Sequence, residues 1–162
     1  MSLVVAEIRS RAIALSVALL VLVAAPLAAA QDPRSSEVQN AAREWLKLVD
    51  QGDYRASWKA AGKKFQQTFT EAGWAAAAGK LRAPFGPAEA RTVALTHFDT
   101  RFPNLPDGDY ALVQFRTSFK GKDYSGETVN LEHEDTGWRV IGYVIRCNHL
   151  RGAAHVGRPG TA

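Results

Sequence analysis

Cysteine is almost absent from this chain of 162 residues, which contains only Cys147. One cysteine cannot form an intramolecular disulfide, so a hydrophobic core has to stabilise the fold. Histidine is also scarce: the four residues His97, His133, His149 and His155 lie far apart, and no His-Glu-x-x-His or Cys-x-x-Cys motif is present. Because such motifs are the usual sequence signs of a zinc site, the sequence gives no reason to expect a bound metal or another cofactor.

Motifs of nucleophilic catalysis and of phosphate binding are missing too. There is no Gly-x-Ser-x-Gly motif, and the glycine-containing stretch 121–126 lacks the spacing of a Walker loop. Basic residues alternate with acidic ones, and Lys63-Lys64 is the only adjacent basic pair. A run or stripe of positive charge is the usual mark of a nucleic-acid-binding surface, so we expect no nucleic-acid partner.

The first 30 residues differ in kind from the rest. Arg9 and Arg11 precede an apolar run over 12–27, and three alanines follow at 28–30. This order is typical of a secretory signal peptide, cleaved after Ala30, and predicts a periplasmic or secreted protein. An uncleaved anchor is the alternative, although the run is slightly short for a full span. No later segment resembles a membrane span, and the mature chain, without two basic residues and one acidic residue, has a net charge of +3 instead of +4.

The first half of the mature chain has the pattern of three helices. After a linker over 31–35, Ser36 and Gln39 have the spacing of a capping box, which predicts a helix to Gln51. Asp53 is a candidate cap for a second, shorter helix, and Thr70 for a third that ends before residue 84, a proline.

The period changes to two in the second half, which predicts strands over 91–98, 109–119, 127–134 and 138–146. Helices followed by a meander of strands indicate an α+β fold, with three N-terminal helices packed on one face of a curved four-stranded antiparallel sheet. One domain over 36–147 accounts for this order. The remaining residues, 148–162, are rich in glycine, alanine and basic residues without periodicity, so we expect a disordered tail.

The three-residue loop 135–137 fixes a register for the last hairpin. If Glu134 lies opposite Trp138, then Leu131 lies opposite Ile141, Val129 opposite Tyr143, and Glu127 opposite Ile145. Glu127, His133 and Tyr143 then fall on the inward face, whereas Gln114, Arg116, Glu132 and Trp138 fall on the outward one. A slip of one residue would reverse the faces of one strand.

This order of elements resembles the cystatin-like, nuclear-transport-factor-2-like architecture, in which a sheet curves around a long helix and leaves a conical cavity. The sequence between about Ala41 and Arg146 also resembles a bacterial exported family of unknown function, DUF4019. The residues that carry this second resemblance are Trp45-Leu46, Asp50, Gly52-Asp53-Tyr54, Ser57-Trp58, Trp74, Arg82, Pro84-Phe85-Gly86, Pro106-Asp107-Gly108, Tyr110, Phe115, Thr117-Ser118-Phe119, Glu127-Thr128-Val129 and Trp138-Arg139-Val140-Ile141-Gly142-Tyr143. This family brings no assigned activity, so the resemblance implies no functional residue.

A cavity of this type predicts a small set of candidate ligand-binding residues, namely Arg82, Glu127, Tyr143 and His133. An ion pair between Arg82 and Glu127 that joins the helices to the sheet is the structural alternative. Trp138 and Arg116 are candidates for an interaction face, through which the protein could also form a homodimer. We expect a non-catalytic module that binds a protein or a small molecule. The alternative is a small hydrolase or isomerase with acid–base residues in the cone, so whether the protein is an enzyme stays open.

Overall fold

The structure, a computed structural model, describes residues 32–147, except for the side chains of residues 122–124 and 147. The predicted signal peptide with its cleavage site at Ala30, the predicted tail over 148–162 and the thiol of Cys147 lie outside these residues. Within them the chain forms helices first and strands afterwards, as the sequence predicts.

Four helices precede the sheet in the described part of the chain, one more than predicted. They are α2 (Arg34–Asp50), α3 (Tyr54–Ala60), α4 (Lys63–Thr68) and α5 (Glu71–Arg82). The additional helix, α4, has six residues and buries only Phe65, so it is too short to show a helical period in the sequence.

Contacts with the last hairpin of the sheet hold the start of α4. The backbone N–H of Gly62 donates to the carbonyl oxygen of Val140 at 2.8 Å, and that of Lys63 donates to the Glu134 carboxylate, also at 2.8 Å. A Cβ atom at Gly62 would lie 2.6 Å from that carboxylate, so a larger residue here would displace the Glu134 side chain that caps α4. A partner distant in sequence therefore supplies the cap that α4 lacks.

The predicted capping box at the first helix is wrong. Helix α2 begins at Arg34, within the predicted linker, and Pro33 occupies the N-cap position without a side-chain hydrogen bond. Proline has a backbone angle already suited to a helix start, which explains the earlier beginning. The Gln39 side chain instead donates to the hydroxyl of Thr96 at 2.9 Å. The caps predicted at Asp53 and Thr70 are confirmed.

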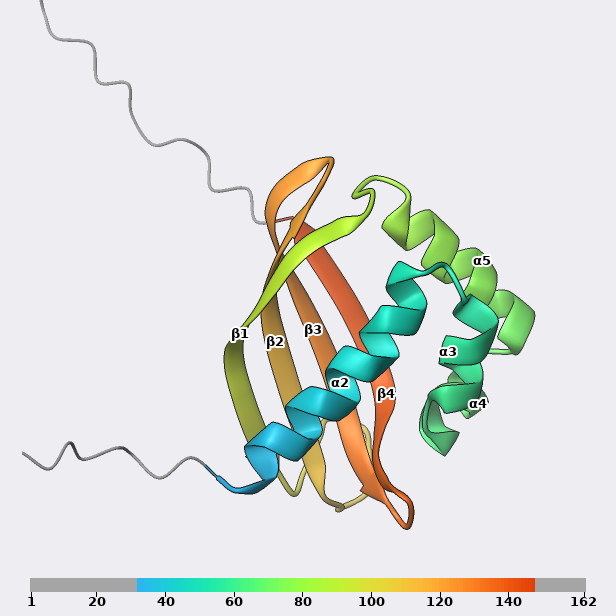
Figure 1. Ribbon diagram of the computed structural model, residues 1–162. Coiled ribbons are helices and arrows are strands. Elements are labelled where there is room, and N and C mark those ends of the chain that lie inside the picture. Colours follow the sequence, from blue (N-terminus) through green and yellow to red (C-terminus); the bar gives the residue numbers. More distant parts are fainter. Residues whose placement is uncertain (1–31, 148–162) are drawn as a thin grey trace, which may run out of the picture. The chain divides into compact units, whose positions relative to one another are not determined.

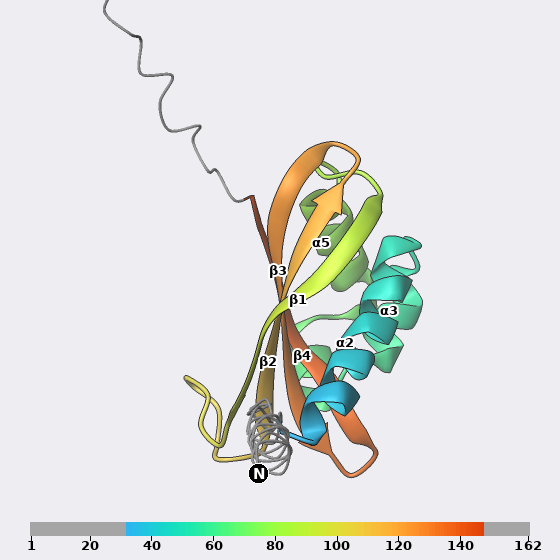
Figure 2. The same cartoon turned by 60° about the vertical axis from the view of Figure 1, so that its left-hand side comes forward.

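The strands form one antiparallel sheet with the order β1 (Ala88–Asp99), β2 (Tyr110–Phe119), β3 (Lys122–Glu134) and β4 (Gly137–Cys147). Helix α2 crosses the sheet obliquely, and α3, α4 and α5 lie beyond β4 in the same layer (Figure 1). Seen from the side, the four described helices lie on one side of the sheet, and no described helix covers the opposite face, which we call the open face (Figure 2). The α+β fold with helices on one face of a four-stranded antiparallel sheet is confirmed.

The register of the last hairpin is correct at one end and wrong at the other. Val129 pairs with Tyr143, and Glu127 with Ile145, as predicted, but Leu131 pairs with Val140 and His133 with Trp138. An irregularity between Leu131 and Asn130 absorbs one residue of β4. A bulge of this kind shifts which side chains face the core on the two sides of it.

Trp138 is consequently on the inward side, and its predicted outward position is wrong. Only 6% of the residue is exposed, and it belongs to the main core together with Val140. Its ring lies 5.7 Å from that of Phe98 on β1.

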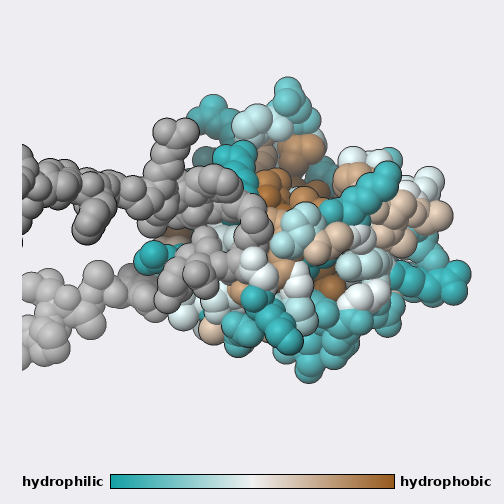
Figure 3. Space-filling model, turned by 90° about the horizontal axis from the view of Figure 1, so that it is seen from above, coloured by the Kyte–Doolittle hydropathy of each residue, from teal (hydrophilic) through white to brown (hydrophobic). Residues whose placement is uncertain are grey.

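The core lies between α2 and the inward face of the sheet. Helix α2 contributes buried Val38, Ala42, Leu46 and Val49, and the sheet contributes Ala111, Val113, Phe115, Val129 and Leu131. Beside them an aromatic cluster fills the space under α3, α4 and α5: the ring of Trp45 lies 5.7 Å from that of Trp74 and 5.9 Å from that of Phe65. Seen from above, hydrophobic residues gather toward the middle and hydrophilic ones around the rim (Figure 3).

Candidate functional site

Glu127 on β3 is fully buried and accepts hydrogen bonds from four side chains. Its Oε1 atom accepts from the Tyr143 hydroxyl at 2.6 Å and from Nη1 of Arg82 at 3.1 Å. Its Oε2 atom accepts from the Thr117 hydroxyl at 2.5 Å and from Nε of Arg91 at 2.7 Å. A buried carboxylate is costly unless it is paired and hydrogen-bonded, and here both oxygens are satisfied on both counts.

A second carboxylate completes the set. Asp50, the last residue of α2, accepts from Nη2 of Arg82 at 2.8 Å and from Nη1 of Arg91, also at 2.8 Å. Each arginine therefore bridges the two carboxylates, and the charges of the four groups cancel. We call Asp50, Arg82, Arg91, Thr117, Glu127 and Tyr143 the buried ion network.

The environment of this network raises the pKa of the Tyr143 phenol and of the Arg91 guanidinium. Burial, followed by the negative charge of Glu127, raises the pKa of Tyr143 above that of an exposed phenol. Burial would lower the pKa of Arg91, but its hydrogen bonds to Asp50 and Glu127 outweigh this effect and raise it. The network thus contains no unpaired carboxylate and no phenol poised to release a proton near neutral pH, which are the groups that acid–base catalysis would need.

The structure brings together three of the four predicted ligand-binding residues, because Arg82, Glu127 and Tyr143 all belong to the buried ion network. His133 lies apart from them. Its side chain is exposed near the last hairpin, with its ring 5.1 Å from that of Trp138. The ion pair between α5 and the sheet is present.

Sequence reasoning missed Asp50, Arg91 and Thr117 as members of this network. Arg91 starts the period-two pattern of β1 on the same side as Val93, which packs against the core. A charged residue in an inward position is a usable signal, because such a residue is rarely buried without a partner. Asp50 gave no signal beyond its place at a helix end.

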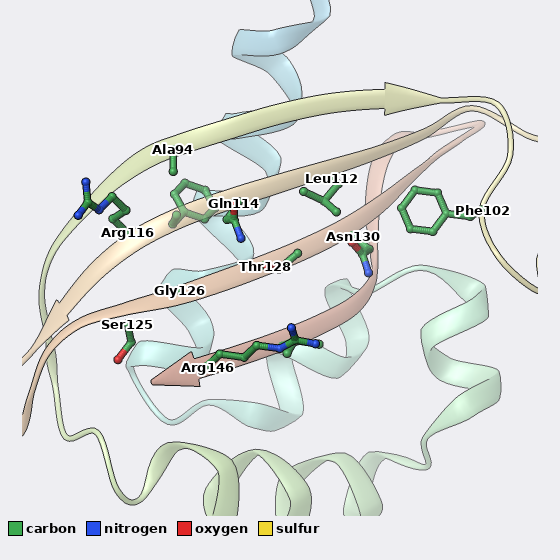
Figure 4. Close-up of a pocket in the computed structure, with 12 residues that line it drawn as sticks. Ala94, Phe102, Leu112, Gln114, Arg116, Ser125, Gly126, Thr128, Asn130 and Arg146 are labelled. Carbon is green, nitrogen blue, oxygen red and sulfur yellow. The ribbon is translucent and has the colours of Figure 1, made fainter. Parts of the chain in front are cut away.

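The open face of the sheet carries a groove of about 710 Å³. It is lined by Ala94, Phe102, Leu112, Gln114, Phe115, Arg116, Ser125, Gly126, Thr128, Asn130, Val144 and Arg146. Figure 4 shows Gln114, Thr128 and Asn130 along its middle, Arg116 and Arg146 on β2 and β4 at one end, and Phe102 at the other. None of these described lining residues is acidic.

Two buried polar atoms of residues that line the groove have no hydrogen-bond partner among the described residues. They are the hydroxyl oxygen of Ser125, a residue that is 2% exposed, and the side-chain oxygen of Asn130. Buried polar atoms are normally paired. Alternation along β3 places the Ser125 side chain on the face of Glu127, so only Asn130 presents its unpaired oxygen on the open face.

A second, smaller groove of about 510 Å³ lies between α2 and β4. Trp45 and Leu48 line it from α2, and Trp138 and Val140 from β4. The Nε1 atom of Trp138 also has no hydrogen-bond partner within residues 32–147.

The described residues contain no group of three histidine, cysteine or acidic side chains that could hold a metal ion. No helix among them is long and apolar enough to cross a membrane.

These features define a small α+β domain in which an ion network joins the helices to the sheet. Within the described residues, no helix covers the other face of the sheet. A family model matches residues 41–143, most of the chain, and its description is "Protein of unknown function (DUF4019)". The chain belongs to this family, as the sequence resemblance indicated. No curated protein and no solved structure matches the chain. The whole buried ion network lies within the matched residues, whereas Arg146 lies just beyond them.

Proposed function

We propose that this protein is an exported, non-catalytic binding module that holds a small molecule in the groove on its open sheet face. The observation that carries the proposal is the contrast between the two faces of the sheet. On the helix side, the ionisable groups of the buried network bond to each other. On the open side, polar and apolar side chains line a groove that none of the helices within residues 32–147 covers.

The size and lining of the groove support this proposal. Small-molecule sites typically measure about 300–1,000 Å³ and combine apolar walls with a few polar groups. Leu112, Phe102 and Val144 supply apolar surface, and Gln114 and Asn130 supply amides. Of the large hydrophobic side chains, Leu95 at 49% and Val144 at 41% are conspicuously exposed, and both lie on β-strands of this sheet.

The acid–base alternative finds little support in the geometry. It needs a carboxylate that can exchange a proton with a substrate, but the carboxylate of Glu127 is occupied by four donors and is fully buried. The aromatic side chains of Trp45, Phe65 and Trp74 fill the neighbouring space. We also propose that the fold has a cystatin-like architecture. The oblique course of α2 across the sheet supports this (Figure 1).

Native mass spectrometry of the mature protein, recovered from the periplasm without denaturation, tests this function. We expect a mass above that of the processed chain, lost on unfolding. The variant Thr128→Trp, which fills the middle of the groove, should carry no added mass, whereas Thr68→Trp on the exposed surface of α4 should keep it. A bare mass for the unaltered protein would overturn the small-molecule proposal and favour a protein partner, to be sought by cross-linking.

A further inference from the structure

The indole N–H of Trp138 sets this residue apart from the other tryptophans. Trp45, Trp58 and Trp74 each donate their indole N–H to an oxygen of the chain at 2.7–2.9 Å. Trp138 is only 6% exposed, yet its N–H has no hydrogen-bond partner among residues 32–147. Because a buried donor without a partner costs free energy, an acceptor that reached this atom would be bound favourably.

The side chains that touch Trp138 leave its N–H unpaired. The rings of Phe98 and His133 lie 5.7 and 5.1 Å from its ring, and neither side chain accepts the hydrogen bond. Trp138 also lines the groove of about 510 Å³ between α2 and β4. In Figure 1 the first half of β4 is seen between α2 and α4. The groove is therefore the open space from which an acceptor outside the chain can approach Trp138.

Small side chains on two helices keep this groove open. Ala41 on α2 and Ala60 on α3 line it, and both are partly buried against the core. Leu48 on α2 and Val140 on β4 add apolar surface, and Trp45 adds an aromatic ring. Such walls favour an aromatic ligand, because aromatic rings pack well against each other and bury a large apolar area.

The charged residues of the groove do not select a ligand of one sign. Glu44 and Lys47 are both exposed, carry opposite charges and lie one turn apart on α2. The guanidinium group of Arg139 donates to the hydroxyl of Thr136 at 3.1 Å. The volume of about 510 Å³ lies within the range of about 300–1,000 Å³ that is typical of small-molecule sites. The groove thus favours a small and neutral molecule.

We propose that the groove between α2 and β4 binds a flat, neutral aromatic molecule whose hydrogen-bond acceptor takes the N–H of Trp138. The ring of this molecule lies beside Trp45, in the space that Ala41 and Ala60 leave. This second site is separate from the groove on the open face, because the two grooves share no lining residue among those described and α2 lies on the opposite side of the sheet. It therefore does not depend on the proposed function.

Two probes of the same shape test this site: quinoline, whose ring nitrogen is an acceptor, and naphthalene, which has no acceptor. Nuclear magnetic resonance of the ¹⁵N-labelled mature protein reports the indole N–H signals of its four tryptophans, and the signal that Trp138→Phe removes belongs to Trp138. We expect quinoline to shift this signal downfield until it saturates, and naphthalene at the same concentration to leave the proton unbonded. Quinoline should bind about fivefold more tightly than naphthalene, the effect of one neutral hydrogen bond.

The variant Trp138→Phe removes the donor and keeps an aromatic ring in the core. We expect it to bind quinoline about fivefold more weakly than the unaltered protein does, and naphthalene with nearly unchanged affinity. Shifts of backbone N–H signals around the groove measure both affinities in this variant.

The variant Ala41→Leu keeps Trp138 and fills the groove. Leucine is a good helix former, so α2 should persist. We expect this variant to bind neither probe. Ala76→Leu makes the same change at an exposed position of α5, and it should bind both probes as the unaltered protein does.

Three outcomes would overturn this second site. They are an indole signal of Trp138 that quinoline does not move, equal affinity for the two probes, and quinoline binding that survives Ala41→Leu. Thr128→Trp, which fills the groove on the open face, should leave quinoline binding unchanged. If it abolishes that binding, quinoline occupies the open face, so the second site fails while the proposed function gains support. A bare mass in native mass spectrometry would overturn the proposed function alone, because the second site is tested with added probes.

Discussion

At the scale of single residues, the buried ion network shows how a charged core can be tolerated. Burial of the Glu127 carboxylate has a large desolvation cost. The attraction of Arg82 and Arg91 offsets this cost because both carboxylate oxygens are also hydrogen-bonded. A hydrophobic replacement of the whole set could stabilise the fold equally well. The network instead fixes where α5 and the end of α2 pack against the sheet, because the ion pairs form in only one geometry.

Removal of one charge from this network should destabilise the fold strongly. Glu127→Gln keeps the shape of the side chain but leaves two buried arginines with only Asp50 to balance them. We expect the free energy of unfolding, measured with urea, to fall by about 3 kcal/mol. Glu89→Gln makes the same chemical change at an exposed position of β1 and should alter stability by less than about 0.5 kcal/mol. Similar losses in the two variants would show that Glu127 is not held as a buried charge.

The raised pKa of Tyr143 predicts a specific alkaline instability. The folded chain keeps the phenol proton that the unfolded chain releases above about pH 10, so stability from this group is fully present below that pH and is lost as pH rises above it. Tyr143→Phe has no such proton. The difference in unfolding free energy between the unaltered protein and Tyr143→Phe should be constant between about pH 7 and pH 9 and shrink above about pH 10. A difference that stays constant to higher pH would contradict the burial of the phenol beside Glu127.

At the scale of elements, the sequence predicts what depends on local pattern and misses what depends on distant contacts. The long amphipathic period of α2 and the alternation of the strands are local, and both are confirmed. Helix α4 and the irregularity in β4 are not local: Glu134 caps the helix across the chain, and the bulge leaves no mark in the pattern of apolar residues. The same limit applies to the candidate site, since Arg91 and Asp50 come from elements that only the packed fold brings to Glu127.

The bulge in β4 makes a testable difference to two hydrophobic residues on either side of it. Trp138 is turned into the core, where truncation leaves a cavity, while Val144 stays on the open face. Trp138→Ala should therefore lower the unfolding free energy by about 3–5 kcal/mol, and Val144→Ala by less than about 0.5 kcal/mol. Urea unfolding of both variants measures this. The register predicted from the sequence would give small losses in both variants, because it places both Trp138 and Val144 outward.

At the scale of the whole molecule, the two faces of the sheet differ in the side chains that they carry. The helix face holds the core and the buried ion network, in which Arg82 and Arg91 pair with Asp50 and Glu127. The open face has no covering layer among the described residues, yet two of its side chains, Leu95 and Val144, are large and apolar. Water-exposed apolar side chains beside arginines suit a surface that is covered by a ligand when the protein functions.

If the protein is exported as proposed, it meets its ligand in the periplasm or outside the cell. If residues 1–30 act as a signal peptide, the protein recovered from the periplasm begins at Gln31, and its intact mass matches a chain from that residue. Ala28→Arg together with Ala30→Arg replaces the small residues that signal peptidase requires. We expect this variant to stay uncleaved and membrane-associated, whereas Ala153→Arg with Ala154→Arg, the same change near the other end of the chain, should be processed normally. Full-length protein in the cytoplasm of both variants and of the unaltered protein would contradict export.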